Sequence, residues 1–156
     1  MVEEGSHRVS QFSLEGTFIR IFAGTGNEGS ANGELDSPVA IAVLGSSGEV
    51  AIADASDDRS VQIFDSAGNF KRQFGSFGVE TDGQFQCVTA VVSDDHGNLL
   101  ILDYTNRLQV FSPTGKHLCT RNDLGLSNGG AQGIAWSAAG GLAVANGSNH
   151  QCLLWR

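Results

Sequence analysis

Two His-x-Cys pairs have the residue types and spacing that could hold a metal ion. His117 and Cys119 form one pair, and His150 and Cys152 form the other. Residues two apart on a β-strand share a face, so each pair could supply two zinc ligands. However, the two pairs fall at different positions of the repeat described below, so four ligands would not converge. We therefore expect no metal site here.

Two carboxylate clusters and one glycine-rich segment are the other candidates for chemistry. "DASDDRS" (54–60) and "SDDHGN" (93–98) lack the twelve-residue pattern of a calcium loop, so we expect turn and strand-end roles for their Asp residues. "GTGNEGSANG" (24–33) precedes no helix that could hold a phosphate. The chain also lacks a Gly-x-Ser-x-Gly elbow. We expect neither a cofactor nor catalysis.

Composition limits the classes of partner. The 156 residues carry a net charge of −8, which disfavours phosphate backbones and anionic membranes. The chain has an odd number of cysteines, three, and lacks a signal-peptide pattern at its N-terminus. No apolar run approaches the ~18 residues of a membrane span. We expect a cytoplasmic protein with reduced thiols and no membrane association.

Three sets of similar residues recur together at intervals of 43–52 residues. The aromatic set is Phe12, Phe64, Phe111 and Trp155; the polar set that closes an apolar run is Asp54, Asp103 and Asn146; the third set is the runs 38–43, 88–93 and 133–137. Such self-similarity indicates a repeat protein.

Each repeat contains four short runs rich in Val, Ile, Leu and Phe, separated by turn residues, which is typical of β-strands. Gln62 alternates with Val61 and Ile63, so we expect it on a partly wet face. The first two runs are continuously apolar, which is typical of strands covered on both faces. The expected strands are 7–12 and 17–23, then 39–43, 49–54, 60–65 and 70–74, then 88–93, 98–103, 107–112 and 116–120, with hairpin turns at 65–70 and 112–117.

Four-stranded antiparallel units at this period are typical of β-propeller blades. The segments 33–78 and 83–118 resemble NHL repeats in the Gly-x-Leu/Phe before the first strand, the Gly before the second, and "NRLQVF" (106–111). We therefore predict an all-β, NHL-type propeller segment. Its expected parts are a half blade (7–24), two blades (38–75 and 88–120), a partial blade (133–156) and a disordered N-terminus (1–6).

About three blades are fewer than a closed propeller contains, since propellers typically have four to eight. Three interpretations stay open: a fragment of a longer propeller, a homodimer that closes a six-bladed ring, and an open arc. In a homodimer, the terminal strands of two copies could complete each other's blades.

The resemblance implies protein or RNA recognition on the rim formed by the loops between second and third strands and between blades. The candidate rim residues are Asp57, Asp58, Arg59, Phe77, Tyr104 and Arg107. Because these loops are mainly acidic, we expect protein binding rather than RNA binding; Arg59 and Arg107 are expected to pair with strand-end Asp residues.

In the family, NHL repeats often select targets for ubiquitin ligases, whose catalytic domain would lie outside this chain. The alternatives are an RNA-binding propeller and a fragment of a metal-dependent lyase-like propeller.

Overall fold

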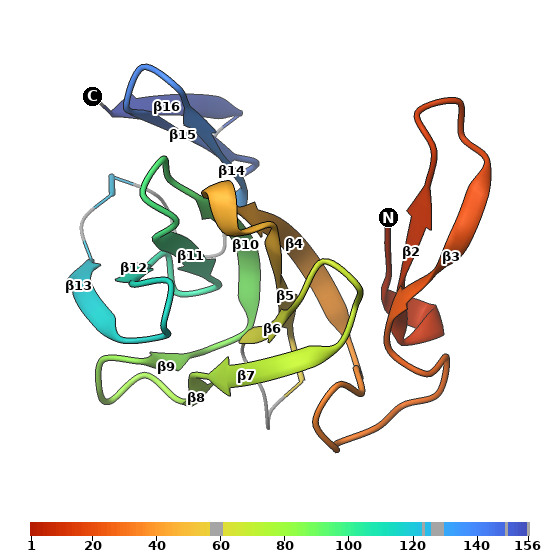
Figure 1. Ribbon diagram of the computed structural model, residues 1–156. Helices are drawn as coiled ribbons and strands as arrows, with labels where there is room; N and C mark the ends of the chain where they lie inside the picture. Colours follow the sequence, from red (N-terminus) through yellow and green to blue (C-terminus); the bar gives the residue numbers. More distant parts are fainter. Residues whose placement is uncertain (57–60, 123, 126–129, 149, 156) are drawn as a thin grey trace.

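A computed structural model describes residues 1–56, 61–122, 124–125, 130–148 and 150–155 of the chain. In these ranges four antiparallel sheets follow one another, each made of strands consecutive in sequence. The sheets form an arc with β2 and β3 at one end and β14 to β16 at the other (Figure 1). The predicted all-β, blade-like architecture is confirmed.

The four sheets have these strands. The first contains β1 (Val2–Glu3), β2 (Arg8–Phe12) and β3 (Phe18–Ala23); the second contains β4 (Pro38–Leu44), β5 (Glu49–Asp54), β6 (Val61–Phe64) and β7 (Phe70–Phe74); the third contains β10 (Val88–Ser93), β11 (Leu99–Asp103), β12 (Leu108–Phe111) and β13 (His117–Arg121); the fourth contains β14 (Ala131–Ser137), β15 (Gly141–Asn146) and β16 (Gln151–Trp155). Between the second and third sheets, β8 (Ser76–Phe77) and β9 (Gln84–Phe85) form a short parallel pair.

The two hairpin turns form where they were predicted. In the first, Asp65 accepts backbone hydrogen bonds from Ala67 and Asn69, and Gly68 has the positive φ that closes the turn. The side-chain amide of Asn69 also donates to Asp65, and this bond lowers the pKa of that carboxyl. In the second turn, Gly115 occupies the equivalent position with φ 85°.

The N-terminus differs from our expectation. Residues 1–6, expected to be disordered, form β1 and a short 3-10 helix, η1 (Glu4–Ser6). Val2 pairs with Val9, and Glu3 pairs with Arg8, so β1 adds a third strand inside β2. The predicted half blade is therefore a three-stranded sheet.

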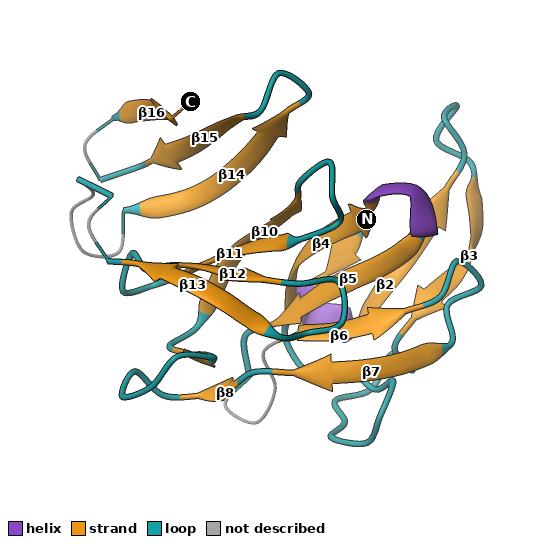
Figure 2. Ribbon diagram, turned by 60° about the vertical axis from the view of Figure 1, so that its left-hand side comes forward, coloured by secondary structure: helices purple, strands orange, loops and turns teal. Residues whose placement is uncertain are grey.

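The core lies between the sheets. The first strands of the second, third and fourth sheets are neighbours in space, as expected of inner strands around one axis, and Figure 2 shows the sheets stacked in order. Ile63, Ile101 and Phe111 belong to the cluster that joins the second and third sheets. The second strands are buried, as predicted, but Ile41 and Val43 of β4 are exposed, because the first sheet has no long inner strand to cover them.

Candidate interaction surface

A buried carboxylate closes the second strand of the third sheet. Asp103 is 0% exposed, and it accepts hydrogen bonds from the backbone amides of Thr105 and Arg107. The guanidinium of Arg107 lies 2.8 Å from the same carboxylate, which confirms the predicted pairing with a strand-end Asp. Asp103 therefore fixes the loop that carries Tyr104.

Arg107 also joins this loop to the connection between the second and third sheets. Its Nη2 donates to the carbonyl oxygens of Gln84 (2.7 Å) and Gly78 (3.3 Å), and its Nη1 donates to that of Val79 (3.2 Å). The backbone amide of Tyr104 donates to Gln86 and Cys87 on the same connection. Segments 75–87 and 103–107 thus form one surface, called the rim patch below.

Two glutamines anchor the connections that lead into the second and third sheets, and our expectation for one of them was wrong. Gln62 was expected on a partly wet face but is 0% exposed, as is Gln109. Gln109 accepts from the amide of Gly83 (2.8 Å) and donates to the carbonyl of Gln84 (2.7 Å). Gln62 makes the same two bonds with Gly33 and Glu34. These bonds satisfy the buried amides.

The sequence contained one signal for this anchoring role: Gln occupies the same place in "VQIF" (61–64) and "LQVF" (108–111). Alternation of apolar and polar residues could not reveal it, because the bonding partners lie 25 to 29 residues upstream.

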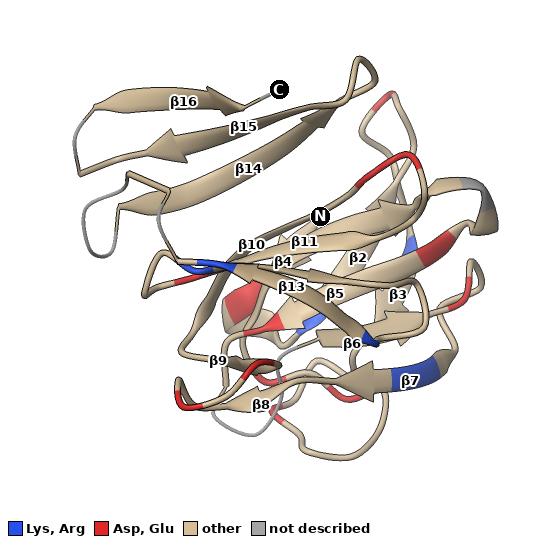
Figure 3. Cartoon of the chain, turned by 90° about the vertical axis from the view of Figure 1, so that its left-hand side faces the viewer, with Lys and Arg blue, Asp and Glu red and all other residues tan. Residues whose placement is uncertain are grey.

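The rim patch presents aromatic and acidic side chains. Phe77 is 52% exposed and Tyr104 is 56% exposed, while the Asp82 side chain is 65% exposed. A hollow of about 470 Å³ is lined by Val79, Glu80, Thr81, Asp82, Gln86, Thr105, Arg107, Thr120 and Asn122. Figure 3 shows acidic segments along the loops beside β8 and β9.

The rim residues Asp57, Asp58 and Arg59 lie outside the described residues. Asp54, just before them, is buried and accepts from the backbone amides of Asp36 and Ser37. Glu3 occupies the same strand-end position in the first sheet. Hydrogen bonds from Arg8 and Ser10 hold the pKa of Glu3 below its ordinary value. These strand-end carboxylates have structural roles.

The His-x-Cys pairs are not brought together as ligands in the described residues. His117 lies 2.9 Å from the Thr120 hydroxyl and 3.7 Å from Asp82. Cys119 and Cys152 are exposed on different sheets. No group of three or more His, Cys, Asp or Glu residues in the described ranges could hold a metal ion. Within those ranges, no helix is long and apolar enough to cross a membrane.

Comparison with known proteins agrees with this architecture. No family model matches the chain. The Drosophila melanogaster protein Brain tumor is 26% identical over 113 residues, covering 64% of this chain and 11% of that protein. Two solved structures superpose at the level of fold: a Xanthomonas campestris gluconolactonase (TM-score 0.64, 19% identity) and a chain of a nidogen/laminin complex (TM-score 0.67, 18% identity).

The coverage shows how much of a propeller the chain builds. The superpositions cover 96% and 95% of this chain, but 43% and 52% of the two solved chains. The chain thus spans about half of those propellers and about a tenth of Brain tumor. Its fold is that of an NHL-like, six-bladed propeller, of which it builds about three blades.

Proposed function

We propose that the chain is a non-catalytic, cytoplasmic protein-binding module whose rim patch recognises a basic surface of a protein partner. The observation that carries the proposal is the pair of exposed aromatic side chains, Phe77 and Tyr104, held on one rigid surface beside Glu80 and Asp82. Exposed aromatic anchors supply binding energy at interfaces, and surrounding charges select the partner.

The charge of the rim patch favours protein over RNA as the partner. RNA-binding surfaces combine stacking aromatics with cations that reach phosphates. Here the guanidinium of Arg107 is occupied by Asp103 and by three backbone carbonyls, so it is not available to a phosphate. Glu80 and Asp82, in contrast, would repel phosphates. A role in selecting targets for a ubiquitin ligase is compatible with this surface, and the ligase chemistry would belong to another domain.

The test is a cross-linking and affinity-capture experiment with the wild-type chain and two charge variants. We expect E80K/D82K to lose the basic partners that the wild type captures. D95K is the matched control, because Asp95 lies in the turn between β10 and β11, at the opposite end of the strands. Equal capture by E80K/D82K and the wild type would refute the proposal, as would tight binding of single-stranded RNA at physiological salt.

A further inference from the structure

The first sheet presents a core aromatic side chain that no preceding sheet covers in the described chain. Phe64 packs on Phe22 of the sheet before it (6.5 Å between ring centroids), and Phe111 packs on Phe74 (4.9 Å). Both are at most 2% exposed. Phe12, at the same place in the repeat, is 38% exposed, and its ring neighbour is Phe18 of its own sheet.

The same sheet also lacks its inner strands. β1 pairs with only Arg8 and Val9 of β2, whereas β5 pairs with all four residues of β6. Beside the rest of β2 lies an apolar hollow of about 400 Å³, whose lining includes Met1, Phe12, Ile41, Val43 and Val50. In the second and third sheets, the first and second strands occupy the corresponding space.

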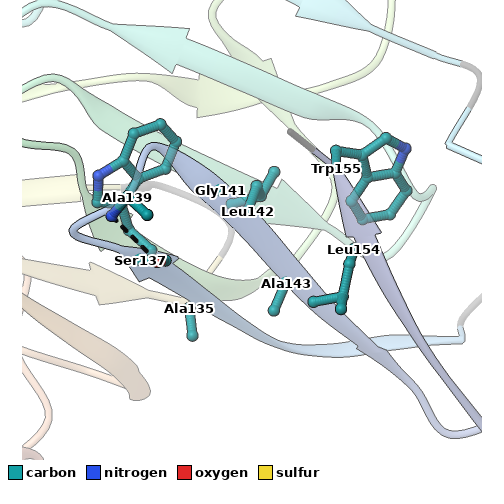
Figure 4. A pocket seen from close by; sticks show the side chains of 9 residues that line it. Ala135, Ser137, Ala139, Gly141, Leu142, Ala143, Leu154 and Trp155 are labelled. Atoms are coloured by element: carbon teal, nitrogen blue, oxygen red, sulfur yellow. Dashed lines mark hydrogen bonds between the residues drawn. The ribbon is translucent and has the colours of Figure 1, made fainter.

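The fourth sheet has the opposite composition. It contains the inner strands β14 and β15, then β16, and it has no fourth strand among the described residues. On the side away from the third sheet lie Ala135, Ala143 and Leu154, opposite to Leu142 and Trp155 (Figure 4). Leu154 is 74% exposed. This end of the arc is therefore apolar and consists mostly of small side chains.

We propose that two copies of this chain close one ring by sharing blades. In each shared blade, β14 and β15 of one copy supply the inner strands, and β2 and β3 of the other supply the outer ones. β2 and β16 hold equivalent places beside a second strand, because Phe12 and Trp155 belong to one aromatic set. The β2 of one copy therefore replaces β16 beside β15 of the other, and β15 replaces β1.

The strand inventory supports a two-fold ring. Without β1 and β16, each copy contributes two complete sheets and two half sheets, which are three blades, so two copies make six. The chain covers 43–52% of the solved propeller chains, which agrees with two copies per ring. The contact closes on itself under two-fold symmetry, so no open ends remain. This inference does not depend on what the rim patch binds.

The pairing of β15 with β16 predicts the register of the shared blade. Leu142 pairs with Trp155, and Ala143 pairs with Leu154. In the shared blade, Leu142 would therefore lie opposite Phe12, and Ala143 opposite Gln11. Figure 1 places β2 and β15 at opposite ends of one arc, so a link between them within one copy is not expected.

The first test combines light scattering with disulfide cross-linking. We expect a dimer of twice 16.3 kDa, and we expect Q11C/A143C to form a covalent dimer on mild oxidation in a C87S/C119S/C152S background. E15C/A143C is the matched control, because Glu15 lies in the turn beyond β2 and should not cross-link. A monomer up to high micromolar concentration overturns the proposal. A dimer in which Q11C/A143C does not cross-link overturns the shared blade.

A second variant pair separates interface from fold. F12S should weaken dimerisation roughly tenfold or more, because it removes an aromatic side chain from the centre of the new contact. L14S is the control, since Leu14 is fully exposed at the hairpin tip, outside that contact. Both variants should keep the wild-type circular dichroism spectrum. If F12S dimerises as tightly as L14S, the proposed interface is wrong.

Discussion

At the scale of single residues, the rim patch depends on a charge that is taken out of water. The Asp103 side chain is 0% exposed and that of Arg107 is 14% exposed. A buried ion pair adds little stability compared with an apolar pair, but the loss of one partner leaves an uncompensated charge. Arg107 also supplies hydrogen bonds to carbonyls that would otherwise lose their partner. The pair therefore determines the geometry of the patch more than the overall stability.

This reasoning predicts a large effect for R107A. We expect the free energy of unfolding to fall by about 3 kcal/mol in urea titrations, because the Asp103 carboxylate is left buried without its cation. R8A is the matched control: Arg8 pairs with Glu3 at 3.0 Å, but the Arg8 side chain is 35% exposed. Its loss should cost less than about 1 kcal/mol. Similar losses in R107A and R8A would contradict this account.

At the scale of elements, the buried glutamines attach irregular connections to regular sheets. Gln109 is held inside the third sheet by strand pairing, so its amide is fixed before it binds Gly83 and Gln84. The anchored connection then holds Phe77 in place, because β8 pairs with β9 immediately beside these residues. A side chain in a strand thereby positions an exposed anchor several residues away.

Q109A should therefore loosen the connection 75–87 in particular. It leaves the Gly83 amide and the Gln84 carbonyl without their side-chain partner, which should cost about 2 kcal/mol of unfolding free energy. Hydrogen exchange should accelerate at Gly83 before it does in β10 to β13. Q73A serves for comparison, because Gln73 is exposed on β7. Unchanged exchange at Gly83 would show that the bond does not anchor the connection.

A second link between elements makes stability depend on pH. Arg72 of β7 donates two hydrogen bonds to Glu49 of β5 and one to the carbonyl of Pro113 in the next sheet. The bonds from Arg72 hold the pKa of Glu49 below its ordinary value of 4.5. Because the folded pKa is lowered, this stabilisation is present above pH 4.5 and is lost as the pH falls through the folded pKa.

We accordingly expect E49Q to reduce stability at neutral pH and to have a smaller effect in acid. The cost at pH 7 should be about 0.5–1 kcal/mol, since both side chains are partly exposed. Urea midpoints of the wild type and E49Q, measured between pH 7 and pH 3, should converge as the pH falls. A difference that is constant across this range would mean that Glu49 acts through packing and not through its charge.

The sequence was sufficient for the strands and insufficient for the inward links. Strand ends could be predicted because apolar runs alternate with Gly-containing turns, and the observed bounds of β5 and β10 match the expected ones. β1 could not be predicted, because two residues are too short for a pattern. The buried state of Gln62 depends on the connection at Gly33, which no local pattern reveals.

For the rim patch, sequence could indicate that Arg107 would pair with a strand-end Asp, because the two residues flank one loop. It could not indicate the carbonyls of Gly78 and Gln84, which reach Arg107 only after the sheets have packed. The exposed aromatic residues Phe77 and Tyr104 were candidates from sequence, and the structure adds that one clamp holds both of their loops.

At the scale of the whole molecule, each sheet is stabilised by its neighbours. Phe111 belongs to the third sheet, yet its ring lies 4.9 Å from that of Phe74 in the second sheet and 5.6 Å from that of Phe85 in the connection. The cluster around it includes Ala51, Ile63 and Ile101, from both sheets. In repeat architectures, such interfaces between units contribute much of the stability.

F111A should consequently weaken two sheets and not one. Removal of a ring that is 2% exposed should cost about 3–5 kcal/mol of unfolding free energy. Hydrogen exchange should rise in β4 to β7 as well as in β10 to β13, because the lost contacts are shared. F77A provides the comparison, since Phe77 is exposed and its loss should leave both sheets protected. If exchange in F111A rises only in the third sheet, the sheets fold independently and the arc is not one cooperative unit.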